Sequence, residues 1–304
     1  MSDTPTLRVL SLGAGVQSTT LALLAAEGTL PGLDAAIFAD TLMEPWELYG
    51  HLSGVERDLR NAGIDTYRVS AGHLWNDLLN PDARYGSIPY YIRNPDGSDG
   101  MGRRQCTSFY KVEPIKKKVR ELLGYPHPAP VPKGVWAEQW IGFSTDEVHR
   151  VRSKLDVRYS RPRHPLLELG MSRTDCETYL RDRGRETAKS ACILCPYHGN
   201  RHWRETRDQR PWEWRVAVVA DRTIRRGGRH GEPLRGEAFL HRSRVPLDEA
   251  PIDRLTKQEW LKANQYDLFE SVGIDPSGEE LENGDPDGCS PYGCRSGNAV
   301  EAAP

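Results

Sequence analysis

The segment from Leu7 to Thr19 reads LRVLSLGAGVQST and joins three local signals. Leu7 to Leu12 is a short run of branched and apolar residues, which predicts a buried strand. Residues 13–15 (GAG) predict a tight turn, and Ser18 to Ala26 (STTLALLAA) has the composition of a helix that ends before Gly28. A buried strand followed by a glycine-rich turn and a helix is the first unit of an α/β fold.

The same alternation continues along the chain. Ala35 to Ala39 (AAIFA) predicts a second buried strand, residues 44–62 predict a helix, and Thr66 to Val69 predicts a third strand. Such alternation implies right-handed crossovers and a parallel sheet covered on both faces. The predicted fold class is therefore α/β, a Rossmann-like parallel twisted sheet followed by an Arg- and Trp-rich C-terminal subdomain. Further along, we expect a loop at 80–104, helices at 111–123 and 174–183, and a strand at 135–141.

Length and composition exclude several classes of protein. The 304 residues are 38% hydrophobic and 28% charged, which excludes collagen-like, coiled-coil and wholly disordered chains. No apolar run approaches the ~18–20 residues that a membrane span needs. The N-terminus also lacks a basic start followed by an unbroken apolar stretch. We therefore expect a cytoplasmic protein with no membrane partner.

The net charge of −2 is unevenly distributed. Residues 275–304 carry seven acidic side chains and one basic, or −6, which leaves 40 basic and 36 acidic residues, or +4, in residues 1–274. A mildly basic body favours anionic ligands. We expect domains at 1–197 and 198–275, followed by an acidic, mobile tail at 276–304.

The turn after the first strand suits an anion. Small residues let the backbone approach a ligand closely, and the helix N-terminus adds N–H groups and the positive end of its dipole. Ser18 and Thr19 add hydroxyl groups. The Walker pattern is absent because no Lys follows the final Gly, and the dinucleotide pattern fails at its third Gly. The alternative is a tight turn that simply needs small residues.

This segment resembles the nucleotide loop of the PP-loop family, the adenine-nucleotide α-hydrolases and their relatives the sulfonucleotide reductases. The family pattern is roughly Ser-Gly-Gly-x-Asp-Ser. Here Gly13 replaces the first Ser and Gln17 replaces the Asp, whereas Gly15 and Ser18 are retained. An Asp-Thr after the second strand also matches, with a helix cap as the alternative for the Asp. The resemblance implies that ATP, or another adenine nucleotide, binds with Mg²⁺ to Ser11, Gly13, Ala14, Gly15, Gln17, Ser18, Thr19, Asp40, Thr41 and Gly142.

Later segments resemble the assimilatory adenylyl-sulfate reductases. Residues 103–115 (RRQCTSFYKVEPI) are similar to their Cys-Cys-x-x-Arg-Lys-Val-x-Pro-Leu segment, and residues 190–196 (SACILCP) supply a Cys-x-x-Cys-Pro. Residues 142–150 (GFSTDEVHR) resemble Gly-x-Arg-x-x-Glu-Ser-x-x-Arg, with Glu147 and Arg150 in register and Ser144 in place of the first Arg. The resemblance spans residues 7–197. It implies a 4Fe–4S cluster held by Cys106, Cys192 and Cys195.

The cluster expectation lacks a fourth ligand. Cys106-Thr107 stands where the reductases have adjacent cysteines, so three thiolates would leave one iron open to a sulfide or a substrate sulfur. This pattern resembles sulfur-handling PP-loop enzymes, including tRNA thiolases and DNA phosphorothioation proteins. One alternative is a zinc site completed by a His such as His198. Thiols that bind no metal are another, and Cys176 is expected to be structural.

Two further segments carry chemistry. Residues 201–244 hold twelve Arg against six acidic residues, with Trp203, Trp212 and Trp214 interleaved. Arg contacts phosphates and Trp stacks on bases, which suits an RNA or DNA substrate. The alternative is a solvated subdomain whose tryptophans pack a small core. In the tail, Cys289 and Cys294 resemble the mobile C-terminal nucleophile of the reductases, with a cluster ligand or an ordinary tail as alternatives.

Together these resemblances predict an ATP-dependent PP-loop sulfurtransferase. ATP would adenylate a substrate oxygen, and sulfur on the open iron would displace AMP. A second hypothesis is a phosphoadenosine phosphosulfate (PAPS) reductase that uses a tail cysteine, and a third is a nucleic-acid-binding protein with a structural metal. The expected partners are an adenine nucleotide, RNA or DNA, a sulfur donor or thioredoxin-like reductant, and a second copy in a homodimer. The candidate catalytic residues are Lys111 and Arg150, which would neutralise phosphate charge, and Glu147, Cys289 and Cys294.

Overall fold

The structure is a computed structural model of the 304-residue chain that describes residues 4–80, 82, 88–102, 105–151, 157–185, 187, 190–226 and 234–255. The chain forms two compact units. Unit 1 consists of residues 1–77, 104–192 and 287–304, and unit 2 consists of residues 78–103 and 193–286. Unit 2 therefore takes in residues 78–103, which come between two parts of unit 1 in the sequence.

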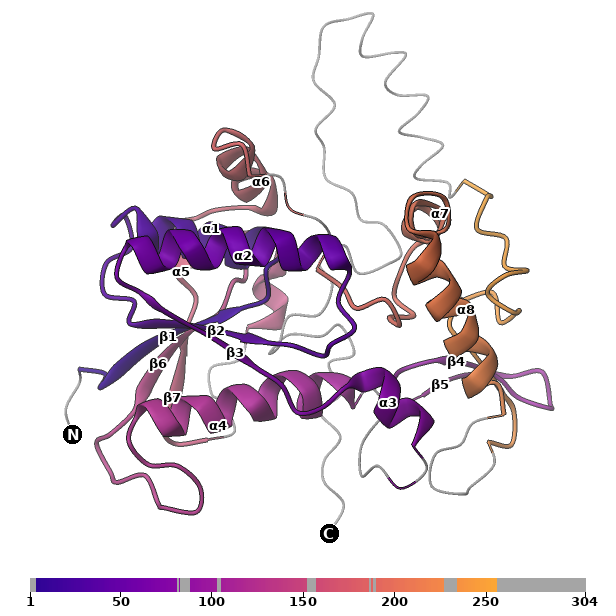
Figure 1. Cartoon of the computed structure of the whole chain (residues 1–304), viewed down its shortest axis with the longest axis horizontal. Helices are drawn as coiled ribbons and strands as arrows, with labels where there is room; N and C mark the ends of the chain where they lie inside the picture. Colours follow the sequence, from indigo (N-terminus) through magenta and orange to yellow (C-terminus); the bar gives the residue numbers. More distant parts are fainter. Residues whose placement is uncertain are drawn as a thin grey trace, which may run out of the picture. The chain divides into compact units, whose positions relative to one another are not determined.

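Unit 1 is built on a five-stranded parallel sheet (Figure 1). Its strand order is β3-β2-β1-β6-β7, and every neighbouring pair is parallel. This arrangement confirms the predicted α/β fold class, and β1 and β2 have the bounds that their apolar runs predict. The strands are β1 (Leu7–Leu12), β2 (Ala35–Ala39), β3 (Asp65–Val69), β6 (Ala137–Trp140) and β7 (Ser160–Arg163).

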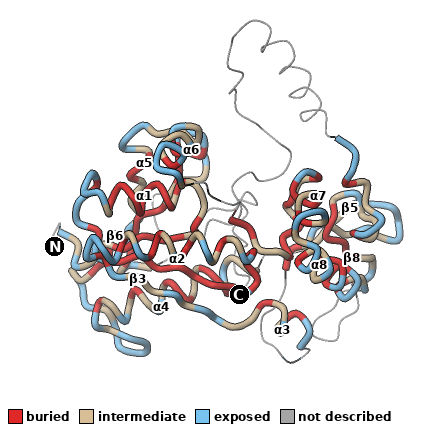
Figure 2. Tube along the Cα trace, turned by 45° about the horizontal axis from the view of Figure 1, so that its top comes forward, coloured by how far each residue is buried: buried red, intermediate tan, exposed pale blue. Residues whose placement is uncertain are grey.

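Helices cover both faces of this sheet (Figure 1). Because successive side chains of a strand point to opposite faces, each strand contributes to two cores. Leu10, Phe38 and Trp140 belong to one core, and Val9 and Ile37 belong to the other. Both cores are seen as buried segments in Figure 2. The first core packs against α1 (Val16–Ala26), α2 (Trp46–Asn61), α5 (Pro165–Glu168) and α6 (Arg173–Arg181), and the second packs against α4 (Glu113–Leu122).

Three buried polar side chains on β1, β6 and β7 form a hydrogen-bonded ladder on the face of the sheet that packs against α4. The Gln139 amide donates to Ser11 Oγ at 2.7 Å, and Ser160 Oγ donates to Gln139 Oε1 at 2.7 Å. All three side chains are buried, so each hydrogen bond satisfies polar groups that would otherwise destabilise the fold. The ladder fixes the register of β1 against β6 and β7.

Two short helical segments of unit 1 depart from ordinary α-helix. The helix predicted at 111–123 begins as a π-helix, η1 (Thr107–Val112), which runs into α4. Such wide turns are rare and often occur at functional sites. After β6, the chain forms the 3₁₀ helix η2 (Thr145–Arg150).

Unit 2 contains a three-stranded antiparallel sheet of order β5-β4-β8. Two of its strands lie in the predicted loop at 80–104, so that prediction is wrong for residues 91–93 and 99–101. These strands were not predicted because three residues are too few to show an alternating pattern. The Arg- and Trp-rich segment forms two helices of this unit, α7 and α8. Helix α3 begins in unit 1 and ends in unit 2. The elements are α3 (Leu74–Leu79), β4 (Tyr91–Arg93), β5 (Asp99–Met101), α7 (Asn200–Gln209), α8 (Pro211–Ile224) and β8 (Glu237–Phe239).

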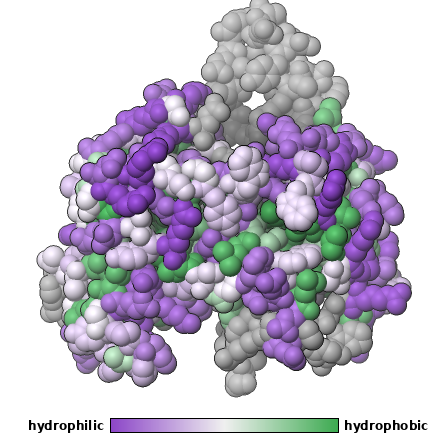
Figure 3. All heavy atoms as spheres, viewed as in Figure 1, coloured by the Kyte–Doolittle hydropathy of each residue, from purple (hydrophilic) through white to green (hydrophobic). Residues whose placement is uncertain are grey.

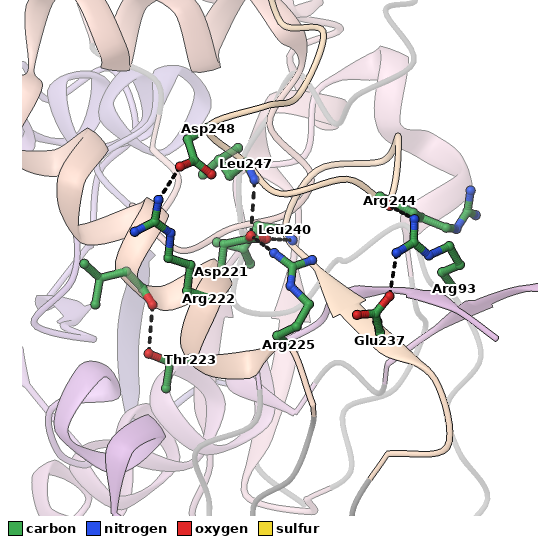
Figure 4. Close-up of polar contacts among 11 residues, drawn as sticks. Arg93, Asp221, Arg222, Thr223, Arg225, Glu237, Leu240, Arg244, Leu247 and Asp248 are labelled. Atoms are coloured by element: carbon green, nitrogen blue, oxygen red, sulfur yellow. Dashed lines mark hydrogen bonds and ion pairs between the residues drawn. The ribbon is translucent and has the colours of Figure 1, made fainter. Parts of the chain in front are cut away.

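A buried carboxylate anchors α8 within unit 2 (Figure 4). Asp221 accepts the backbone N–H groups of Leu240 at 2.7 Å and Leu247 at 3.2 Å, and it also pairs with Arg225. The Arg225 guanidinium lies 3.8 Å from the ring centroid of Phe239 in β8. These contacts fix the inner face of α8 and the chain that follows β8.

The surface is largely polar on the face that Figure 3 shows, where hydrophobic side chains form small separate patches. This agrees with a mean hydropathy of −0.64. In the described part of the chain, no helix is long and apolar enough to cross a membrane.

A buried histidine in unit 2 is held in its neutral form. His241 Nε2 lies 3.0 Å from Asn200 Oδ1, which can only accept, and Nδ1 accepts the Ser243 N–H at 3.1 Å. Burial, followed by the positive charge of Arg242, lowers the pKa of His241 to about 4. The folded protein therefore resists protonation of this ring.

We expect His241 to make the protein less stable in acid. Between the ordinary pKa of about 6.5 and the folded pKa of about 4, only the unfolded chain binds this proton, so the free energy of unfolding falls as the pH is lowered. The full effect is on the order of 3 kcal/mol. Urea unfolding of His241→Gln between pH 7 and pH 4 should show a shallower decline than the wild type. Parallel declines would contradict this prediction.

Candidate functional site

The sheet of unit 1 reverses its direction of growth between β1 and β6. From β1 the chain adds β2 and β3 on one side, and it later adds β6 and β7 on the other. In open α/β sheets, ligands bind beyond the carboxyl ends of the strands at such a point. The segments that follow β1 and β6 are residues 13–15 and 141–144, so the candidate site is built from these segments.

The loop after β1 holds itself in shape. Gly13 N–H donates to Ser18 Oγ at 3.2 Å, and Ser18 Oγ donates to the Gly15 carbonyl at 3.3 Å. Ala14 has a φ of +54°, an unusual value for a residue with a side chain. Helix α1 begins at Val16, and no side chain in the described part of the chain caps its N-terminus. The first-turn N–H groups and the helix dipole therefore give this end of α1 a positive potential.

Two neighbouring segments pack closely against this loop. A Cβ built on Gly142 would lie 3.0 Å from the Ser18 nitrogen, so any other residue would require the backbone to shift by a few tenths of an ångström. On another side, Ser190 Oγ donates to the Gly13 carbonyl, and its Cβ would lie 3.2 Å from a Cβ on Gly15. The structure thus brings together Gly13, Gly15, Ser18 and Gly142 of the predicted site, with Ser190 as a residue that sequence analysis missed.

A second group links α1 to the segment after β6. Gln17 Nε2 donates to Glu147 Oε2 at 3.2 Å, and Arg150 pairs with Glu147 Oε1. All three side chains are buried. The Arg150 guanidinium also lies 5.2 Å from the ring centroid of Phe143. The structure therefore assembles Gln17, Glu147 and Arg150, although the charge of Arg150 is matched by that of Glu147.

Glu44, in the loop after β2, forms another buried ion pair with Lys111 of η1. Lys111 Nζ lies 3.1 Å from Glu44 Oε1, and Thr41 Oγ1 donates to the same oxygen at 3.2 Å. Asp40 Oδ1 accepts the Leu42 N–H at 2.7 Å and the Tyr49 hydroxyl at 2.8 Å. Burial and the nearby Asp40 carboxylate raise the pKa of Tyr49. Since α2 begins after Pro45, Asp40 stabilises a turn and does not cap the helix.

Thr19 lies at a different place from the one expected. Its side chain is buried, and Thr19 Oγ1 lies 3.0 Å from His51 Nε2 in α2. Burial lowers the pKa of His51, with a further effect from Arg185. The Thr19 hydroxyl thus joins α1 to α2, whereas Ser18 lies in the loop itself. The contact with His51 could not be predicted from sequence because the two residues are 32 positions apart.

The cysteines are distributed over both units. Half-buried Cys106 directly precedes η1, half-buried Cys192 ends a segment of unit 1, and buried Cys195 belongs to unit 2. Among the described residues, no three His, Cys, Asp or Glu side chains form a group that could hold a metal ion. Cys176 is buried in the first core, and burial raises the pKa of its thiol to about 12. Cys289 and Cys294 lie outside the described residues.

Comparisons with known proteins add a structural likeness. No protein-family model matches the chain, and no curated protein matches it in sequence. The U34-tRNA thiolase NcsA from Methanococcus maripaludis with its 4Fe–4S cluster is similar in structure, with 14% identity, a TM-score of 0.36 and coverage of 73% of each chain. A likeness at this level does not establish a family. The fold class follows from the strand order described above.

We expect the close approach at Gly142 to be required for stability. Gly142→Ala should lower the free energy of unfolding by about 1–3 kcal/mol, because its Cβ would press on the backbone of Ser18. The matched control is Gly50→Ala in α2, where nothing lies within 4 Å of the added Cβ. This control should stabilise the protein by about 0.5–1 kcal/mol through helix propensity. Urea denaturation measures both effects, and equal effects of the two variants would contradict the predicted packing.

Proposed function

We propose that this protein is a PP-loop-type enzyme that binds MgATP at residues 13–18 and adenylates a substrate for sulfur transfer. The observation that carries the proposal is the N-terminus of α1, which no described side chain caps. It lies where the sheet reverses its direction of growth and is packed between Gly142 and Ser190. Backbone N–H groups in this setting suit phosphate oxygens, and small residues leave room for close approach. The expected residues Ser11, Asp40 and Thr41 lie at the carboxyl ends of β1 and β2.

An exposed tryptophan supports a nucleotide over a simple oxyanion. Trp46 begins α2 and is 68% exposed. The contact between Thr19 of α1 and His51 of α2 gives a common reference level on the two helices. Val16, the first residue of α1, lies three residues before Thr19, and Trp46 lies five residues before His51. At 1.5 Å per residue, Trp46 therefore lies about 3 Å beyond the start of α1. Packed helix axes lie about 8–10 Å apart. We infer that the indole stacks on the base of a nucleotide whose phosphates lie at residues 13–18.

The proposed chemistry is an adenylation followed by a displacement. A substrate oxygen attacks the α-phosphorus of ATP, the bond to the bridging oxygen breaks, and pyrophosphate leaves with its magnesium ion. Hydrosulfide then attacks the activated carbon of the substrate, and AMP leaves. Preorganised N–H groups of α1 would stabilise the charge that develops on the phosphate. For Lys111 or Arg150 to contribute as well, each must exchange its carboxylate partner for a phosphate oxygen.

A 4Fe–4S cluster stays a prediction of the resemblance. Among the described residues no metal-ligand group is assembled, and no step above passes through a cluster. Cys106, Cys192 and Cys195 are the residues that would hold it. The alternative zinc site uses the same thiols with His198, which packs against the rings of His202 and Trp203.

We expect the protein to release pyrophosphate from ATP and to lose nucleotide affinity when Trp46 is replaced. Trp46→Ala should weaken ATP binding by roughly 5- to 150-fold, because base stacking contributes about 1–3 kcal/mol. Binding of inorganic triphosphate, which has no base, should be unchanged. Isothermal titration calorimetry measures both affinities. The control is Trp212→Ala, which removes another exposed tryptophan from unit 2.

Two outcomes would contradict this prediction in different ways. If Trp46→Ala binds ATP as the wild type does, the base-stacking role is wrong while nucleotide binding stands. If the wild type neither binds ATP nor releases pyrophosphate, the proposed function is wrong. Release of sulfite from an adenylyl sulfate would instead support the sulfonucleotide reductase hypothesis.

We expect protein purified without oxygen to be brown and to contain iron and acid-labile sulfide. Cys106→Ser, Cys192→Ser and Cys195→Ser should each remove the iron, because two thiolates rarely hold a cluster. Cys176→Ser is the matched control and should retain it, since Cys176 is buried in the first core. Metal analysis by mass spectrometry and the visible absorption spectrum measure both effects. Colourless protein with stoichiometric zinc would overturn the cluster and favour the alternative site.

A further inference from the structure

Helix α8 presents one continuous stripe of exposed side chains. Its members are spaced three or four residues apart, so they lie on a single face of the helix and its C-terminal continuation. Trp212 is 73% exposed and Val219 is 49% exposed. We name this the α8 stripe, and it consists of Trp212, Arg215, Val219, Arg222 and Arg226.

The opposite face of α8 is fixed in unit 2. Ala217, Ala220 and Ile224 are buried, and Asp221 is anchored by Leu240, Leu247 and Arg225. Figure 4 shows Arg222 pointing away from this anchor toward Asp248, while Arg225 reaches toward Asp221. The stripe is thus held on a rigid scaffold, which lowers the entropy lost when a partner binds.

Part of the positive charge of the stripe has no carboxylate partner in the described part of the chain. Arg222 pairs with Asp248, but among the described residues no carboxylate lies within ion-pair distance of Arg215 or Arg226. Glu237 forms its ion pair with Arg93, which lowers the pKa of the Glu237 carboxyl, and the more distant charge of Arg226 adds a smaller effect in the same direction.

The neighbouring helix differs in this respect. Three arginines in α7 or directly after it have acidic partners, which are Glu205 for Arg201, Asp208 and Asp253 for Arg207, and Glu213 for Arg210. Arg204 of the same helix donates to the Ile252 carbonyl. These three arginines are therefore less available to an anionic ligand than Arg215 and Arg226 of the α8 stripe.

We propose that the α8 stripe binds unpaired RNA. Arginines spaced along a helix can contact successive phosphates, and an exposed indole offers a flat surface for a base that is not already stacked in a duplex. Folded RNA presents such bases in its loops. The stripe is about 20 Å long at 1.5 Å per residue, which matches about six nucleotides at a rise of 3.4 Å.

The mixed composition of the stripe argues against a membrane. A helix that lies on a bilayer separates an apolar face from a basic face, whereas here Trp212 and Val219 alternate with arginines on the same face. The proposal goes beyond the proposed ATP chemistry and does not depend on it, because α8 belongs to unit 2 and RNA binding is measured without ATP.

The test uses the full-length protein and a fluorescein-labelled RNA hairpin with a loop of about six nucleotides. Fluorescence anisotropy over a series of KCl concentrations gives the affinity and its salt dependence. Arg215→Ala/Arg226→Ala should lower the slope of log K against log [KCl] by about 1.4, since each phosphate contact to a single strand contributes about 0.7. Trp212→Ala should weaken binding by roughly 5- to 150-fold with little change in slope, and Trp212→Phe should restore most of it.

The matched control is Arg201→Ala/Arg207→Ala, which removes the same charge from α7. Both arginines have acidic partners, so the salt slope should stay close to that of the wild type. Melting temperatures of all variants should agree with that of the wild type, because the stripe is on the surface.

Several results would overturn the proposal. An equal loss of slope in the α7 control would mean that overall charge, and not the stripe, governs binding. Unchanged affinity in Trp212→Ala would remove the stacking role. Binding of fully paired RNA as tightly as the hairpin would exclude recognition of unpaired bases. Tighter binding of a DNA hairpin, or of polyglutamate, would assign the stripe to another ligand.

Discussion

The contact between Gly142 and the first turn of α1 is the constraint on which the candidate site depends. The Ser18 nitrogen comes so close to Gly142 that a side chain at position 142 would displace the backbone of one or the other. Because Gly142 follows β6 and Ser18 follows β1, this contact can form only when the two strands are neighbours in register. The Ser11–Gln139–Ser160 ladder secures that register from inside the sheet. The shape of the loop is therefore a consequence of strand pairing.

Two buried cations near the carboxyl ends of the strands have carboxylate partners, whereas buried Asp40 accepts hydrogen bonds from Leu42 and Tyr49. Lys111 faces Glu44, and Arg150 faces Glu147, with all four side chains buried. Burying an ion without its partner costs several kcal/mol, so neither cation is expected to leave its carboxylate unless another anion replaces it. Among the described residues of the candidate site, the backbone N–H groups at the start of α1 supply positive potential that no carboxylate neutralises. This arrangement favours a ligand that brings several negative oxygens at once.

The sequence predicted the parts of the fold that leave a local pattern. Strand β2 is a continuous apolar run and β1 is rich in leucine and valine because both strands are covered on two faces, and their bounds agree with prediction. Strand β7 (SRPR) gave no such signal, since it lies at the sheet edge and contains two arginines and a proline. Contacts between distant positions were also missed. Gln17 meets Glu147 across 130 positions, and Ser190 meets Gly13 across 177. Composition identified the Arg- and Trp-rich segment. Which tryptophans are buried depends on the face of its helix that each occupies, and this leaves Trp203 of α7 buried and Trp212 of α8 exposed.

The division of unit 2 between two chain segments has a consequence for synthesis on the ribosome. Strand β4 pairs with β8, and the partners Tyr91 and Phe239 are 148 positions apart. At about 5–20 residues per second, translation takes roughly 7–30 s to reach β8 after β4 has been made. During this interval unit 1 can acquire all five of its strands, while one edge of β4 has no partner. Exposed strand edges promote aggregation, so β4 is a vulnerable part of the nascent chain during this interval.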